Sequence, residues 1–166
     1  MAKAKENLTE NEEKEAKASA VMNTKAEAFN EFLEENQIQV FSKEVLTDDL
    51  NTVVFRSRIE TKGQIIPMAV IIDDSVFTII RTQIASGVSI DKKDKLIAFF
   101  NMLNEKYKIF KYYLRQDGIV FLDVTLPFVN ETFDSKMVQL MLSVLVKHLD
   151  ETYEDIMSQL WSKEEK

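Results

Sequence analysis

The chain contains no cysteine, only three glycines and two prolines, and a single histidine among its 166 residues. Without cysteine, a disulfide framework, a thiolate metal site and a cysteine nucleophile are all excluded. The shortage of glycine argues against a glycine-rich phosphate-binding loop and against long irregular loops. No apolar run approaches the roughly 20 residues that a membrane-spanning helix needs. These absences predict a cytoplasmic protein that has no membrane segment and binds no cofactor.

The charge balance is acidic, with 28 acidic residues against 21 basic ones and a formal net charge of -7. A chain with this excess of negative charge repels the phosphate backbone of nucleic acids. We therefore expect no nucleic-acid partner. A length of 166 residues fits one domain that buries a full hydrophobic core without disulfides or metals.

The first 22 residues mix Lys, Glu, Asn and Ala and hold very few apolar side chains. Because the cost of ordering such a segment is not offset by burial, we expect residues 1–22 to form a charged, disordered leader. The alternative is a fraying, solvated helix, since Ala, Glu and Lys are good helix formers. Residues 23–162 are then expected to form a single α+β domain.

Residues 51–83 are expected to form three consecutive strands, at 52–60, 64–73 and 76–82, because these runs are rich in Val, Ile, Phe and Thr. If Lys62-Gly63 is a two-residue hairpin loop, the facing residues are Ile59 and Ile66, Ser57 and Met68, Phe55 and Val70, and Val53 and Ile72. A short strand at 38–46 precedes them. Pro67 lies inside the third strand and has no amide hydrogen, which indicates either a bulge or an unpaired position there.

Helices are predicted at 24–36, 91–107 and from about 132 to 161. Thr24 and Glu27 have the spacing of a capping box, and Asp91 is the expected N-cap of the second helix. Between the last two helices, Asp117-Gly118 predicts a type I′ turn in a hairpin over 108–129. The resulting order is helix, four strands, helix, hairpin, helix. It predicts an α+β fold with the helices packed on one face of an antiparallel sheet.

One face of the three-strand segment is plainly core, whereas the second face mixes apolar and charged side chains. That second face is too apolar for open water and too charged for a sealed interior. We therefore predict a partner or dimer surface on it, made by Val54, Arg56, Arg58, Ile65, Ala69, Ile71 and Ile80.

Three acids and one histidine are the polar candidates for chemistry. Asp123 lies in an apolar strand, where burial can raise a carboxyl pKa into a catalytic range. It could equally accept a hydrogen bond from Tyr112 across the hairpin, or lie where the sheet is wet. His148 lacks a visible orienting acid, so a surface or half-buried helix position is expected. Asp73 and Asp74 could bind a cation, but acidic pairs are also ordinary turn residues.

Four strand arginines, Arg56, Arg58, Arg81 and Arg115, could together form a site for an anion or an acidic peptide. The alternative is that their stems cover apolar neighbours while the guanidinium groups stay in water. The sequence holds no Walker loop, nucleophile elbow or metal-binding histidine pair. We therefore expect a protein without catalytic activity and without a bound metal.

The opening helix AEAFNEFL at 26–33, the strands at 53–80, the helix at 96–107, the hairpin at 110–129 and the long last helix together resemble a known fold. The pattern is similar to the type III secretion chaperone-like fold, and more closely to the YbjN-like family, described as bacterial sensory-transduction regulators. The likeness covers roughly residues 24–161. It implies a non-enzymatic, dimeric protein that binds an extended segment of another protein. The alternative from the residues is a regulatory domain that binds a small ligand or anion through Arg56, Arg58 and Arg81.

Overall fold

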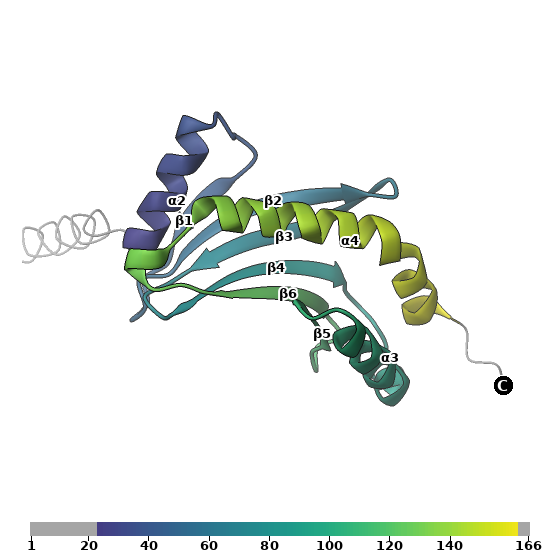
Figure 1. Cartoon of the computed structure of the whole chain (residues 1–166). Coiled ribbons are helices and arrows are strands. Elements are labelled where there is room, and N and C mark those ends of the chain that lie inside the picture. Colours follow the sequence, from purple (N-terminus) through teal and green to yellow (C-terminus); the bar gives the residue numbers. More distant parts are fainter. Residues whose placement is uncertain (1–22, 163–166) are drawn as a thin grey trace, which may run out of the picture.

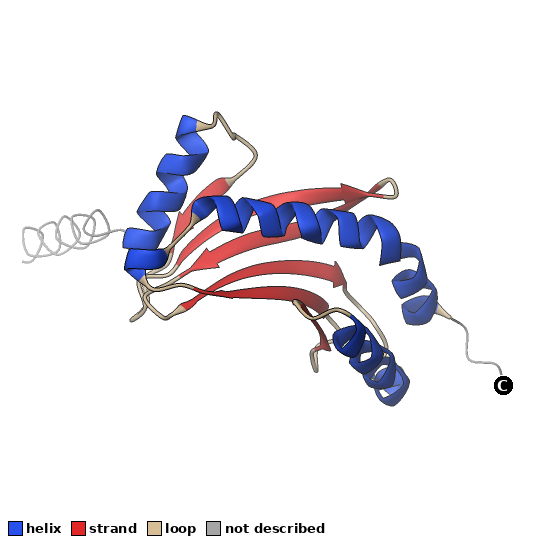
Figure 2. Cartoon of the chain, viewed as in Figure 1, coloured by secondary structure: helices blue, strands red, loops and turns tan. Residues whose placement is uncertain are grey.

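A computed structural model describes residues 23–162 and shows three α-helices and one six-stranded antiparallel sheet in this part of the chain (Figures 1 and 2). The predicted α+β class is confirmed. The leader predicted over residues 1–22 lies outside the described residues. The elements follow one another as α2 (Thr24–Glu35), β1 (Ser42–Val45), β2 (Val53–Thr61), β3 (Gln64–Ile72), β4 (Phe77–Ala85), η1 (Ile90–Lys92), α3 (Lys93–Lys106), β5 (Phe110–Leu114), β6 (Val120–Pro127), η2 (Asn130–Thr132) and α4 (Ser135–Trp161).

The strands lie in the order β1-β2-β3-β4-β6-β5, and every neighbouring pair is antiparallel. The predicted register of β2 and β3 is confirmed, including the pairs of Ile59 with Ile66 and Val53 with Ile72. Lys62 and Gly63 have φ values of 48° and 71°. Positive φ at both central residues defines the type I′ turn, whose twist matches that of the strands it joins.

Pro67 pairs in regular register with Arg58 of β2, whereas the pairing of β3 with β4 begins only at Met68. The proline therefore lies where β3 has no β4 partner. Of the two alternatives, the unpaired position is confirmed and the bulge is not. The register shift of the sheet lies elsewhere, in β4 between Gln83 and Ala85.

The helices pack against one face of the sheet, and the hydrophobic core lies between them and that face (Figure 2). From α2, the Phe29 ring meets Phe55 edge-on at a centroid distance of 4.9 Å. From α3, Phe100 stacks on Tyr112 of β5 at 5.9 Å. The long helix α4 crosses the sheet and buries one stripe completely, made by Val138, Leu145, Leu149, Ile156 and Leu160.

The predicted start of α2 near Thr24 is confirmed, but two predicted helix caps are wrong. The N-cap of α2 is Asn23, whose Oδ1 accepts hydrogen bonds from the amides of Lys25 and Ala26 at 3.0 and 3.2 Å. The α3 region opens with the short helix η1, capped by the Ser89 hydroxyl, so Asp91 is not its N-cap. Both corrections reflect competition among neighbouring capping side chains, of which only one can reach the free amides.

The predicted type I′ turn between β5 and β6 is also wrong, because Gly118 is the only residue of this turn with positive φ, at 76°. The Gly118 amide donates to Arg115 O at 3.1 Å, and the Arg115 amide donates to Ile119 O at 2.9 Å. This is a three-residue loop with glycine in the left-handed position. A Cβ at Gly118 would lie 2.6 Å from Val88 O, so the close approach of residue 88 also requires glycine.

Candidate functional site

The sheet face opposite the helices is not covered by any helix of the described chain, and we call it the open face. Strand pairing places on it six of the seven residues predicted for a partner surface: Val54, Arg56, Arg58, Ile65, Ala69 and Ile71. Val54 points to this face but is itself buried, at 5 % exposure. Ile80 is a correction. It pairs with Val70 and Val124, is fully buried, and therefore belongs to the helix-covered core. Its neighbour Ile79 pairs with Ile71 and takes its place on the open face.

The open face has an apolar centre flanked by charge. β3 presents only apolar side chains there, from Ile65, which is 65 % exposed, through Pro67 and Ala69 to the half-buried Ile71. On β2, by contrast, Arg56 and Arg58 are exposed. A solvent-facing sheet surface usually carries mostly polar residues, so this apolar strip is a candidate contact surface.

An ion pair lies on the β4–β6 half of the open face. Arg81 donates two hydrogen bonds to Asp123, from Nε to Oδ1 at 3.0 Å and from Nη2 to Oδ2 at 2.8 Å. Tyr113 Oη donates a third bond to Oδ2 at 3.1 Å. The hydroxyl partner of Asp123 is therefore Tyr113 and not Tyr112, because adjacent strand residues point to opposite faces. Burial and the neighbouring carboxylate raise the pKa of Tyr113 to about 12, and Asp123 raises the pKa of Arg81.

The four candidate arginines do not converge. Arg56 pairs with Glu44 at 2.6 Å, Arg115 with Asp117 at 3.0 Å, and Arg81 with Asp123. Each of these acids balances its arginine locally, so the described residues form no cluster of unpaired guanidinium groups that could draw in an anion.

His148 lies on α4 in the core and is 4 % exposed. Its Nε2 lies 2.7 Å from Tyr112 Oη, and its ring stacks on Phe110 at a centroid distance of 4.0 Å. Burial, with a smaller contribution from the charge of Lys106, lowers the pKa of His148 to about 4. Because His148 lies under the helices and Asp123 lies on the open face, the structure does not bring these two candidates together.

Asp73 and Asp74 serve the turn between β3 and β4. The Asp74 carboxylate accepts hydrogen bonds from the side-chain amides of Asn23 at 2.6 Å and Asn51 at 2.5 Å. Asp73 accepts from the Ser75 amide at 2.9 Å. These contacts tie the start of α2 to two loops. Residues 23–162 contain no group of three or more acids and histidines placed to hold a metal ion.

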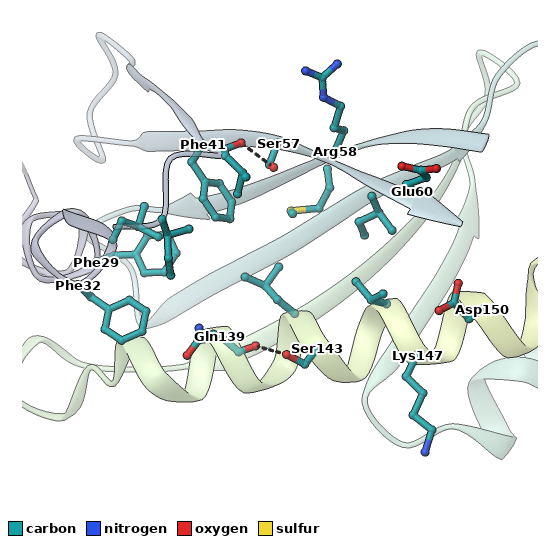
Figure 3. Close-up of a pocket in the computed structure, with 17 residues that line it drawn as sticks. Phe29, Phe32, Phe41, Ser57, Arg58, Glu60, Gln139, Ser143, Lys147 and Asp150 are labelled. Atoms are coloured by element: carbon teal, nitrogen blue, oxygen red, sulfur yellow. Dashed lines mark hydrogen bonds between the residues drawn. The ribbon is translucent and has the colours of Figure 1, made fainter. Parts of the chain in front are cut away.

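A second candidate site is an open apolar cavity of about 550 Å³ between β2, α4 and the end of α2, which we call the β2–α4 groove (Figure 3). Phe29, Phe32 and Phe41 meet at one end of it. Its remaining apolar walls come from Leu33, Ile38, Ile59, Met68, Leu142 and Val146. The volume lies in the range of ligand-binding clefts. Sequence reasoning missed this groove, because its walls come from segments far apart in the chain.

The outer edge of β2 borders the groove and is only partly paired. β1 pairs with residues Val53 to Arg56 of β2 and no further. Beyond that point the preceding chain turns away, and Val40 O is held by the Ser57 hydroxyl at 2.8 Å instead of by a strand amide. Residues 58–61 of β2 thus have no strand partner on this side within the described chain. Unpaired backbone groups at a strand edge accept an added strand.

The charged residues around the groove are arranged unequally. In Figure 3, the head groups of Arg58 and Lys147 point away from the cavity, while Glu60 and Asp150 lie near the end opposite the phenylalanines. Asp150 Oδ1 also accepts a hydrogen bond from Thr61 Oγ1 at 2.6 Å. The groove therefore has an aromatic end and an acidic end.

No protein-family model matches the chain, and a comparison with curated proteins finds no match. Among residues 23–162, no helix combines the length and apolar character needed to cross a membrane.

Proposed function

We propose that the chain is a non-enzymatic protein-interaction module that binds an extended apolar segment of another protein in the β2–α4 groove. The observation that carries this proposal is the position of the groove beside the unpaired part of β2. A segment that adds to residues 58–61 gains main-chain hydrogen bonds, and every second side chain points toward the apolar walls.

The chemistry of the bound segment follows from the two ends of the groove. Phe29, Phe32 and Phe41 favour a bulky apolar side chain at one end. Glu60 and Asp150 favour a lysine or arginine at the other. The partner is therefore a protein that exposes an extended apolar stretch flanked by basic residues.

The order of the elements supports the further proposal that the domain has a type III secretion chaperone-like, YbjN-like fold. Such a fold suits the same function, because proteins of this shape bind extended segments. The alternative function, binding of a small anion by Arg56, Arg58 and Arg81, gains no support, since two of these arginines are ion-paired on separate strands.

The test uses labelled ten-residue peptides with leucine at alternate positions and lysine or glutamate at both ends. Fluorescence anisotropy with the full chain measures their affinity. We expect micromolar binding of the lysine-ended peptide and about tenfold weaker binding of the glutamate-ended one, a difference of about 1.4 kcal/mol. A lysine-ended peptide that is N-methylated at alternate amides should also lose binding, because it cannot pair with β2.

Two substitutions on the same helix separate the groove from the general surface. Leu142 lines the groove, whereas Val144 lies two residues on, is 37 % exposed and is not among the residues that line it. Leu142→Arg should abolish peptide binding and Val144→Arg should leave it unchanged. Equal binding by both variants, or no binding of the lysine-ended peptide to the unmodified chain, would contradict the proposal.

A further inference from the structure

The open face has the dimensions of a stable dimer interface. Its six strands contain 4, 9, 9, 9, 8 and 5 residues in sheet order. With strands about 4.8 Å apart and a rise of about 3.3 Å per residue, the face measures about 700 Å². Two such faces in contact cover about 1,400 Å², within the range of about 1,200–2,000 Å² that stable interfaces bury.

The charges at the two edges of the sheet are opposite. Residues 23–51, which include α2 and β1, contain seven acidic and two basic residues. Residues 90–117, which include α3 and β5, contain seven basic and four acidic residues. Most of these charges lie on α2, on α3 and in loops, so the β1 edge of the domain as a whole is acidic and the β5 edge is basic. On the open face itself, the two edge strands carry Glu44 on β1 and Lys111 on β5. Two copies attract each other most strongly when the acidic edge of one lies over the basic edge of the other.

From these observations we infer that a second copy of this chain docks on the open face, with the two-fold axis parallel to the strands and midway between β3 and β4. This axis places β3 over the partner's β4 and β1 over the partner's β5. Rotation about this axis leaves a residue's position along the strand direction unchanged. Residues that face one another across neighbouring strands, which we call a row, therefore meet the residues of the same row in the partner. The interface is a different surface from the β2–α4 groove and stands without it.

Two rows of the sheet fit this arrangement. Ile71 and Ile79 are cross-strand neighbours, so Ile71 comes to lie over the partner's Ile79 at the apolar centre. Arg56 and Asp123 belong to one row through Ala69 and Arg81. Arg56 of one copy therefore lies over the partner's Asp123, which brings opposite charges together, and Ala69 lies over the partner's Arg81.

The other face-to-face arrangement, with the axis across the strands, places β2 over the partner's β2 and β5 over the partner's β5. When this axis passes through the row of Arg56, Arg56 lies against the partner's Arg56, and Lys111 of the same row lies against the partner's Lys111. Like charges in direct opposition across an interface cost several kcal/mol, so this arrangement is disfavoured.

Cysteine cross-linking tests the arrangement, because the chain has no cysteine of its own. Ser42 on β1 and Lys111 on β5 lie in the same row and are exposed. Because facing sheets lie about 10 Å apart, which is farther than a disulfide can span, the cysteines are joined with a bismaleimide. A mixture of Ser42→Cys and Lys111→Cys chains should form the cross-linked dimer at least tenfold more than either variant alone. Cross-linking of Ser42→Cys with itself, or no excess in the mixture, would overturn the inference.

Sedimentation velocity of the full chain at micromolar concentration tests the dimer itself. The unmodified chain should sediment as a dimer and Ile71→Lys as a monomer, while Met102→Lys on the outer side of α3 should remain dimeric. Ile65 is 65 % exposed, so Ile65→Lys should not disturb folding. This substitution should weaken the dimer at least tenfold. A monomeric unmodified chain would overturn the inference while leaving peptide binding in the groove to its own test.

Discussion

The Arg81 guanidinium spans the β4–β6 pair and holds the Asp123 carboxylate through two hydrogen bonds of 3.0 and 2.8 Å. Asp123 is only 4 % exposed, although it lies on the face that no described helix covers, because Arg81 and Tyr113 enclose it. A buried carboxylate is tolerated when it is paired and hydrogen-bonded. This pairing gives Asp123 a structural role within the open face.

Breaking this pair should destabilise the fold. Arg81→Met leaves the Asp123 carboxylate buried without its partner. We expect a loss of roughly 2–3 kcal/mol in the free energy of unfolding. This is less than the full cost of breaking a buried pair, because the Arg81 side chain is 37 % exposed. Urea denaturation at pH 7 measures this. Arg56→Met is the matched control, since that ion pair is exposed on both sides and should cost less than about 1 kcal/mol. Equal losses in the two variants would refute the assignment.

The only histidine should make stability depend on pH. His148 has a pKa of about 4 in the folded chain and about 6.5 in the unfolded chain, so the unfolded state binds more protons between these values. Stability is therefore complete above pH 6.5 and falls as the pH drops toward 4, by up to about 3 kcal/mol. Urea denaturation at a series of pH values between 7 and 4 measures the slope.

His148→Gln is the control for this dependence, because it removes the titrating group while its amide can still bond Tyr112. The variant should be less stable at pH 7 and should lose the part of the pH slope that belongs to the histidine. Since the chain has one histidine, its ring proton resonances also report the titration directly. A midpoint near 6.5 in the folded protein would show that His148 is not buried as described.

Asn104 of α3 should protect the β5 edge of the sheet. Its side-chain amide pairs with the Tyr112 backbone as a neighbouring strand would, with Tyr112 N to Oδ1 at 2.8 Å and Nδ2 to Tyr112 O at 3.2 Å. Asn104→Ala should cost about 1–2 kcal/mol and speed hydrogen exchange of the Tyr112 amide. The exposed Asn101, one turn earlier, provides the control substitution Asn101→Ala, which should change neither quantity. Unchanged exchange at Tyr112 in Asn104→Ala would contradict this role.

The parts of the fold that short-range signals determine were predictable from the sequence. Lys62-Gly63 fixed the hairpin register of β2 and β3, because a two-residue turn allows only one pairing. Ile80 was assigned to the wrong face because no such short-range signal precedes its strand. The longer turn before β4 does not fix the β3–β4 register, and a shift of one residue exchanges the two faces of a strand.

The candidate sites were predictable only in part. The sequences of β2 and β3 alone were enough to find six residues of the open face, because successive side chains of a strand point to opposite faces of the sheet. The Tyr113 contact of Asp123 depended on which hairpin turn forms. The β2–α4 groove depends on how α4 crosses the sheet and on where β1 ends, and neither is encoded in a local pattern.

Methyl NMR during a peptide titration tests segment binding most directly. Met68 lines the groove, whereas Met102 is exposed on α3 and serves as an internal control. With methyl-labelled methionine and isoleucine, adding the lysine-ended peptide should shift the signals of Met68 and Ile59 in a saturable manner and leave Met102 unchanged. Saturable binding that moves other methyl groups but neither Met68 nor Ile59 would show that the groove is not the binding site.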